Sequence, residues 1–208
     1  MNRLDNFINE CDIALKTLSF KKSGTGRLYP ANETSSSLSK EEKSLSAQLM
    51  RVNLAGEVAA QALYRGQAMV CKDAEIKNHL VQAGEEETDH LIWCKKRLEE
   101  LNGKPSILNP VWYAGSFAIG AIFGSFGEKT SLGFVEETEK QVVKHLEKHL
   151  DKVSKNDTET IEILKTMRAD EDEHAQEAIE NGSESLSEPT KKVMSFTAKV
   201  MTSSSAYI

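Results

Sequence analysis

The sequence reads EEETDH over residues 85–90 and DEDEH over residues 170–174. Each stretch contains a glutamate followed three positions later by a histidine, as Glu87 with His90 and Glu171 with His174. Residues three apart lie on one face of an α-helix, so each pair can direct a carboxylate and an imidazole toward the same point. Two such pairs, completed by one glutamate from each of two other helices, are the ligand set of a two-metal site inside a four-helix bundle. The spacing therefore predicts an all-α protein.

The two further glutamates that we expect are Glu57 and Glu139, and their positions predict two helical hairpins. In an antiparallel hairpin, residues equidistant from the turn lie at the same height. The midpoint between Glu57 and Glu87 is residue 72, where Lys-Asp interrupts the helical pattern. The midpoint between Glu139 and Glu171 is residue 155, inside the turn signal Ser-Lys-Asn-Asp. We expect a ferritin-like four-helix bundle in which the two hairpins form an internal repeat.

The surroundings of each glutamate distinguish ligands from surface charges. Glu57 is the sole charge in the stretch LAGEVAA, residues 54–60. Burying an unpaired carboxylate there costs several kcal/mol, and metal coordination offsets that cost; a solvated helical glutamate is the alternative. Glu136 and Glu137 compete with Glu139, and only the turn symmetry favours the last. A solvated acidic face is expected for Glu85, Glu86, Asp172 and Glu173, and a surface or supporting role for His79, His145 and His149.

Four carboxylates and two imidazoles suit iron or manganese more than zinc, which prefers four tight ligands. Iron is favoured if the site carries out oxygen chemistry. The expected ligands of two iron ions are Glu57, Glu87, His90, Glu139, Glu171 and His174.

Start and stop signals divide the chain into three parts. An N-terminal helix and loop occupy residues 1–38, the bundle occupies 39–180, and a linker with an amphipathic helix occupies 181–208. A capping box of Ser39 and Glu42 opens the first bundle helix, and Asn156 with Glu159 is the capping signal for the last. The expected helices cover residues 3–17, 40 to about 70, 74–101, 132–152, 157–180 and 190–201.

Residues 105–127 carry no charge and form the least ordinary segment. Pro110 and three serines make it a poor spanning helix, which needs ~20 predominantly apolar residues. We interpret it as an interfacial, membrane-facing connection with Trp112 and Tyr113 at headgroup level; a buried connection across the bundle end is the alternative. In the last helix, one apolar face beside lysines suits an anionic lipid surface. That face consists of Val193, Phe196 and Val200, near Lys191, Lys192 and Lys199.

Composition excludes several classes of function. The chain has 208 residues, 39% of them hydrophobic, and a net charge of −6, so it offers no broad basic surface for nucleic acid. Its three cysteines show no CxxC spacing, which argues against both a disulfide framework and a zinc knuckle. The N-terminus lacks the apolar core of a secretory signal. We expect a protein of a reducing compartment.

Several of these stretches together resemble the demethoxyubiquinol hydroxylases, the di-iron monooxygenases of ubiquinone biosynthesis, in their bacterial form. The resemblance covers residues 49–174, and the family's iron ligands fall on the same six residues that the spacing selects. The chain departs from the family at Leu54, where a histidine is usual. The stretches that carry the resemblance are MRVNLAGEVAAQALYRGQA (50–68), EEETDHLIWCKKRL (85–98), PSILNPVWYAGSFAIG (105–120), SLGFVEETEKQV (131–142) and DEDEH (170–174).

The resemblance implies that the enzyme inserts one oxygen atom of O₂ into the ring of a polyprenylated methoxy-benzoquinol. It implies two Fe²⁺ ions per subunit, with Glu87 and Glu171 bridging them and Glu57 and Glu139 as terminal ligands. An external reductant is required, with NADH as the candidate. The implied location is the cytoplasmic face of the cell membrane, peripherally bound. Expected partners are the prenylated quinol, membrane lipid, a ubiquinone-biosynthesis accessory protein and a second copy of the chain, with no nucleic acid.

Two other functions are compatible with parts of the pattern. A ferroxidase or a rubrerythrin-like peroxide scavenger uses the same six ligands, but an iron-storage shell has no use for an exposed apolar patch. A lipid-binding scaffold with a decayed site is disfavoured because all six ligands are present.

Overall fold

The computed structural model describes residues 3–31 and 37–208, and every regular element in those ranges is an α-helix. The all-α prediction is confirmed. The helices are α1 (Arg3–Leu18), α2 (Lys40–Val70), α3 (Ala74–Glu100), α4 (Asn109–Gly124), α5 (Glu128–Lys152), α6 (Thr158–Glu180) and α7 (Glu188–Ser205).

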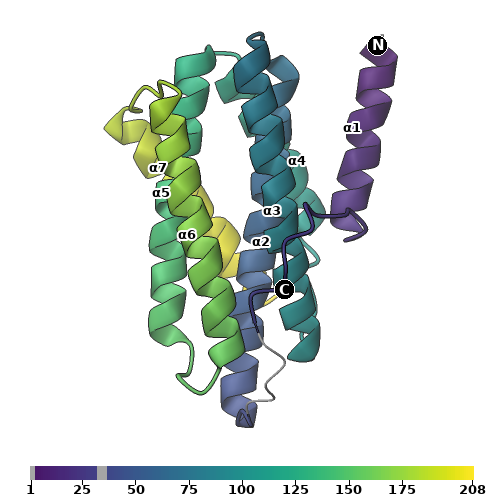
Figure 1. The fold of residues 1–208 in the computed structure, drawn as a ribbon, viewed down its shortest axis with the longest axis vertical. Coiled ribbons are helices and arrows are strands. Elements are labelled where there is room, and N and C mark those ends of the chain that lie inside the picture. Colours follow the sequence, from purple (N-terminus) through teal and green to yellow (C-terminus); the bar gives the residue numbers. More distant parts are fainter. Residues whose placement is uncertain (1–2, 32–36) are drawn as a thin grey trace.

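The central bundle consists of two antiparallel hairpins, α2–α3 and α5–α6, standing side by side (Figure 1). The first hairpin turns between Val70 and Ala74, and the second between Lys152 and Thr158. Residues 72 and 155, the predicted midpoints, lie inside these turns. The arrangement is that of a ferritin-like helical bundle, and it brings the middle of each of the four helices to a common height.

Capping side chains fix where the bundle helices begin. The predicted capping box of α2 is present: Ser39 Oγ accepts from the Glu42 amide, and the Ser39 amide donates to Glu42 Oε2. The predicted N-cap of α6, Asn156, was wrong by one residue. Its cap is Asp157, whose Oδ1 accepts from the Thr160 amide at 3.0 Å and from Arg97 Nη2 at 2.6 Å. A carboxylate satisfies both donors at this buried position, whereas the amide of Asn156 faces Glu42.

Apolar side chains from all four bundle helices fill the interior. Their burial supplies the main stabilising free energy, at roughly 25 cal/mol per Å². Leu54, which replaces the histidine expected from the resemblance, is fully buried among them. The fully buried members include Met50, Leu54, Leu91, Leu98, Leu146, Ile163, Leu164 and Met167 in one cluster and Leu80 and Ala178 in a second.

The uncharged segment forms α4, which packs along α2 and does not cross the end of the bundle. Pro110 lies in the first turn, where a missing amide costs no hydrogen bond. Glycines allow the close approach: a Cβ on Gly120 would lie 2.2 Å from the Leu63 carbonyl oxygen, and one on Gly66 2.2 Å from that of Phe117. The alternative of a buried connection across the bundle end is therefore not what the structure has, and the interfacial role stays a prediction.

The predicted position of Tyr113 at headgroup level was wrong, whereas that of Trp112 stays a prediction. Tyr113 is only 6% exposed and belongs to the core, while Trp112 Nε1 donates to Ser205 Oγ of α7 at 3.0 Å. These rings face the bundle and α7 because the opposite face of α4 carries the exposed aliphatic and phenyl side chains. The exposed residues on and next to α4 are Ile107, Val111, Ile122 and Phe126. No helix in the described ranges has the length and apolarity to cross a bilayer.

The two terminal helices lie outside the bundle. Helix α1 stands apart at the edge of Figure 1 and is tied to α2 by the Glu10–Arg65 ion pair and by a bond from Thr17 Oγ1 to Gln61 Oε1 at 3.0 Å. Helix α7 keeps its predicted apolar face, Val193, Phe196 and Val200, exposed. The cysteines are unpaired, as expected.

Candidate metal centre

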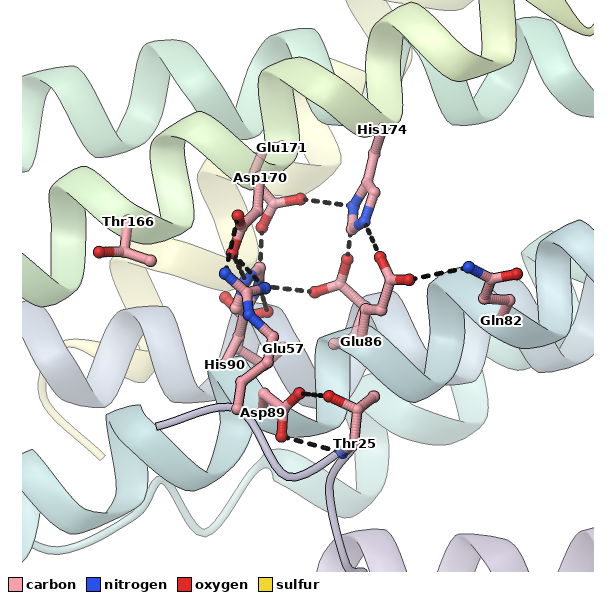
Figure 2. A network of polar contacts seen from close by, with 12 residues as sticks. Thr25, Glu57, Gln82, Glu86, Asp89, His90, Thr166, Asp170, Glu171 and His174 are labelled. Carbon is pink, nitrogen blue, oxygen red and sulfur yellow. Dashed lines mark hydrogen bonds and ion pairs between the residues drawn. The ribbon is translucent and has the colours of Figure 1, made fainter. Parts of the chain in front are cut away.

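Four of the predicted ligands meet in the interior of the bundle. Glu57 from α2, Glu87 and His90 from α3, and Glu171 from α6 each offer an atom within 4.8 Å of the others. All four side chains are at least nine-tenths buried. Their helices come from both hairpins, so the group forms only when the hairpins pack together (Figure 2).

Glu87 and Glu171 lie between the two histidines. His90 Nδ1 is 3.2 Å from Glu87 Oε2 and 3.2 Å from Glu171 Oε1. His174 Nδ1 is 3.2 Å from Glu87 Oε1 and 3.3 Å from Glu171 Oε2. Each of the two carboxylates therefore presents one oxygen to each imidazole, which is the disposition of a group that can bridge two ions. Glu57 lies on the His90 side, with Oε2 3.7 Å from His90 Nδ1.

Glu139 is the sixth predicted ligand. Among Glu136, Glu137 and Glu139, it is the buried residue. It is 1% exposed, and Tyr64 donates its hydroxyl to Glu139 Oε1 at 2.7 Å. Glu136 and Glu137 are instead partly exposed, with 15% of each side chain accessible, and they pair with Lys140 and Lys191. The structure thus places Glu139 inside the bundle and its two competitors outside. Its assignment as a ligand stays a prediction, because its carboxylate is bonded to Tyr64 and is not among the four atoms that converge.

The Nε2 atom of each histidine contacts a carboxylate of the other hairpin. Neither carboxylate was predicted from the sequence. His90 Nε2 lies 2.8 Å from Asp170 Oδ2, and His174 Nε2 lies 2.9 Å from Glu86 Oε2. These contacts leave Nδ1 of each ring facing the interior. Glu86 was predicted to be a solvated charge, which was wrong: its side chain is 31% exposed but bonded to His174. The signal was present, since an acidic residue directly precedes the glutamate of both Glu-x-x-His pairs.

Burial and mutual repulsion perturb the titration of this group. Burial raises the pKa of Glu57 and of Glu139 well above the ordinary value, and neighbouring carboxylates raise both further. Burial opposes the charged form of Glu87, but both histidines outweigh it and lower the pKa of that carboxyl. Burial also disfavours charge on His90, yet Glu87 and the surrounding carboxylates raise its pKa. The cluster therefore gathers acidic groups that cannot all ionise without added positive charge.

These donors fit two divalent cations. Four carboxylates carry a charge of about −4, and two divalent ions with neutral imidazoles neutralise it. Glu87 Oε1 is fully buried and forms no well-aligned hydrogen bond with any described side chain, although His174 Nδ1 lies 3.2 Å from it. A buried carboxylate oxygen without a well-aligned donor is suited to a metal ion, and a set of mostly oxygen donors with two imidazoles suits iron or manganese.

The comparisons with known proteins agree with this geometry. Residues 44–205 match the family described as "Ubiquinone biosynthesis protein COQ7". The chain belongs to this family. A relative from Legionella pneumophila (strain Lens), named 3-demethoxyubiquinol 3-hydroxylase, is 50% identical over 99% of this chain and 97% of its own length. Proteins of the same name from Francisella philomiragia and Nitrosococcus oceani are 48% and 46% identical, covering 96% and 100% of this chain and 94% and 98% of their own lengths.

The family match includes all six predicted ligands and the two outer carboxylates. It begins after the extended segment of residues 19–31, here called the strap, which runs between α1 and α2. Because the relatives are named hydroxylases, the ferroxidase and peroxide-scavenger alternatives are not favoured.

The other histidines lie away from the centre. His145 and His149 pack against each other on α5 with tilted rings whose centroids are 4.0 Å apart, and His149 is buried, so the surface position expected of it was wrong. His79 lies 3.8 Å from Glu177. Two surface hollows of about 840 and 680 Å³ are lined by none of the six predicted ligands.

Proposed function

We propose that this chain is a 3-demethoxyubiquinol 3-hydroxylase, a di-iron monooxygenase that uses O₂ to hydroxylate the ring of a polyprenylated methoxy-benzoquinol. The observation that carries the proposal is the set of buried Glu and His side chains between the two hairpins, in a chain that belongs to the COQ7 family. Relatives with that name match nearly the full length of the chain.

The six predicted ligands divide naturally into bridging and terminal roles. Glu87 and Glu171, each facing both histidines, would bridge the ions, while Glu57 with His90 and Glu139 with His174 would each complete one ion. When bound, two ferrous ions supply the pair of electrons and the open positions that reaction with O₂ requires. An external reductant restores the ferrous state, with NADH as the candidate donor.

The chain's own side chains prepare this chemistry. The outer carboxylates Asp170 and Glu86 hold both imidazoles with Nδ1 inward. The hydroxyl of Tyr64 stays protonated, because burial and the Glu139 carboxylate raise its pKa well above the ordinary value. It can therefore donate a hydrogen bond to Glu139 at neutral pH. The apolar core around the cluster keeps bulk water away from the reacting groups.

The quinol's prenyl tail requires delivery from lipid, and we propose that α4 and α7 dock the bundle on the cytoplasmic face of the cell membrane. Each buried CH₂ of the tail is worth ~0.8 kcal/mol, so extraction into water is prohibitive. Val111 and Ile122 of α4 and Phe126, just after that helix, are more than half exposed, as are Val193 and Phe196 of α7. An amphipathic surface of this kind binds the interface without crossing it.

Quinone profiling of a deletion strain by mass spectrometry tests the activity. Accumulated demethoxyubiquinone, restored to ubiquinone by the wild-type gene but not by Glu171→Ala, is the expected result. The purified protein should hold about two irons per chain after anaerobic Fe(II) loading, and Glu87→Ala or Glu171→Ala one or none. Normal ubiquinone in the deletion strain, or wild-type iron well below one per chain, would show that the proposal is wrong.

A further inference from the structure

The two halves of the centre differ in what holds their outer carboxylates. Asp170, which bonds His90, is contacted at both oxygens by the Arg27 guanidinium: Nη2 donates a hydrogen bond to Oδ1 at 3.0 Å, and Nη1 forms an ion pair with Oδ2 at 2.7 Å. Glu86, which bonds His174, receives one bond from the neutral amide of Gln82 at 3.1 Å. The Asp170 side chain is 16% exposed and that of Glu86 is 31%. An otherwise two-fold arrangement is therefore unequal in its outer contacts.

Arg27 belongs to the strap, which is built to lie close against α3. A Cβ on Gly24 would lie 1.9 Å from Asp89 Oδ1, so a larger residue at this contact would have to displace the Asp89 side chain. Next to it, the Thr25 amide and hydroxyl both donate to Asp89 (Figure 2). The Arg27 guanidinium also stacks 4.9 Å above the Trp93 ring, and Trp93 in turn packs on His90 at 5.3 Å between ring centroids. The strap thus supports His90 through two routes, Asp170 and Trp93.

We propose that Arg27 is a positioning residue that fixes the Asp170–His90 pair and makes the metal position beside His90 hold its ion more firmly than the position beside His174. The proposal rests on the two-iron centre proposed above. It concerns a segment that precedes residues 44–205, the part of the chain matched by the family model.

The physical basis is the bidentate geometry of the contact. A guanidinium that contacts both oxygens of one carboxylate fixes both the position and the orientation of that carboxylate. A fixed Asp170 prevents the His90 ring from rotating away from the interior, which is the first movement that loss of the ion requires. No guanidinium fixes Glu86 in this way, so the His174 ring can turn outward together with the Glu86 side chain, which is 31% exposed. The ion beside His174 should therefore leave first.

Iron release measures this difference directly. The protein is loaded anaerobically with Fe(II), then mixed with an excess of a chelator that forms a coloured ferrous complex. Wild-type protein should release its two irons in two phases of similar amplitude. Loss of a partner behind a ligand typically costs 10–100-fold in metal affinity. Arg27 is one contact further from the ion than Asp170 is, so its loss should have a smaller effect. Arg27→Gln should accelerate the slow phase of iron release about fivefold and leave the fast phase unchanged. Arg27→Lys should give an intermediate rate for the slow phase.

Matched variants separate positioning from a general loosening of the strap. Lys22→Gln removes the strap's other ion pair, with Glu85, and should change neither phase. Arg27→Gln should have a much smaller effect once Asp170→Asn is present, because only the contact through Trp93 then remains. Single-phase release from wild-type protein holding two irons, equal acceleration of both phases by Arg27→Gln, or an undiminished effect in the Asp170→Asn background would each overturn the inference. Wild-type iron well below one per chain would instead refute the proposed function.

Discussion

Glu139 differs from its neighbours Glu136 and Glu137 in depth and in the charge around it. It faces the carboxylates of Glu171 and Glu87 inside the bundle, and burial raises its pKa. Glu139→Gln removes one of the four negative charges that balance two divalent ions, so bound iron should fall from about two to about one per chain. Iron content after anaerobic loading and desalting is the measurement.

The adjacent glutamates are the controls for that prediction. Glu136→Gln and Glu137→Gln remove surface ion pairs with Lys140 and Lys191 and should leave two irons bound. If Glu137→Gln lost an iron and Glu139→Gln retained both, the register of α5 proposed here would be incorrect.

His149 should make the protein sensitive to mild acid. Burial, together with His145 and Lys152, lowers its pKa to about 3. The unfolded chain binds a proton there below pH ~6.5 while the folded chain does not, so stability falls as pH falls through that window. When the pH falls from 6.5 to 4.5, the free energy of unfolding should decrease by about 2 kcal/mol less in His149→Gln than in the wild type. Urea unfolding of the metal-free protein checks this; parallel losses in both proteins would contradict it.

The inner residues of the cluster could be predicted from the sequence because local rules fix their positions. Helical spacing pairs Glu87 with His90, and turn symmetry selects Glu57 as the residue opposite. The outer residues follow no such rule. Arg27 reaches Asp170 across 143 positions of sequence, and nothing local in the strap predicts where an extended segment will lie. Glu86 was misplaced because an acidic run on a helix is usually a solvated face.

Among the elements, α4 depends most on small residues. Gly120 lies against the Leu63 carbonyl, so the methyl group of Gly120→Ala must displace backbone. Overpacking of this kind costs typically 1–3 kcal/mol, and we expect about 2 kcal/mol of lost unfolding free energy. Gly115→Ala, on the same helix with open space around the new methyl, should stabilise by about 0.5–1 kcal/mol through helix propensity. Chemical denaturation of the two variants measures the difference, and equal effects would argue against close α2–α4 packing.

The helical state of α4 was harder to predict than that of the bundle helices. Its sequence is apolar on all sides, so periodicity does not show which face is buried. Tyr113 was placed at a lipid surface because aromatic residues with a polar tip favour that position, yet the same properties suit the edge of a core. Glycines at 120 and 124 gave the better signal, since they mark the face that meets another backbone.

At the scale of the whole molecule, membrane docking should depend on the outer face of α4. The triple variant Val111→Ser, Ile122→Ser, Phe126→Ser removes exposed apolar side chains without touching the core. It should lose most liposome flotation and turnover of long-tailed quinol, with iron content and turnover of a short-tailed analogue retained. Phe117 is unsuitable for this test because it packs on the core.

A single exposed apolar residue elsewhere is the control for flotation. Ile179→Ser on α6 should float as wild type does, since isolated surface side chains carry little membrane affinity. If the triple variant still floated and processed the long-tailed quinol normally, α4 would be a protein interface and docking would have to be sought on α7.

The crossed contacts behind the histidines make the two hairpins self-complementary. Each hairpin contributes a glutamate, a Glu-x-x-His pair and the carboxylate that holds the other hairpin's histidine. One hairpin therefore contains a copy of every kind of group that the inner site and its outer carboxylates need, and lacks only a second hairpin facing it. Two identical hairpins related by a two-fold axis would satisfy the same contacts, because an isologous interface pairs each group with its counterpart. The present chain joins two such halves in one polypeptide, which frees each half to diverge, as the one-sided attachment of Arg27 to Asp170 illustrates.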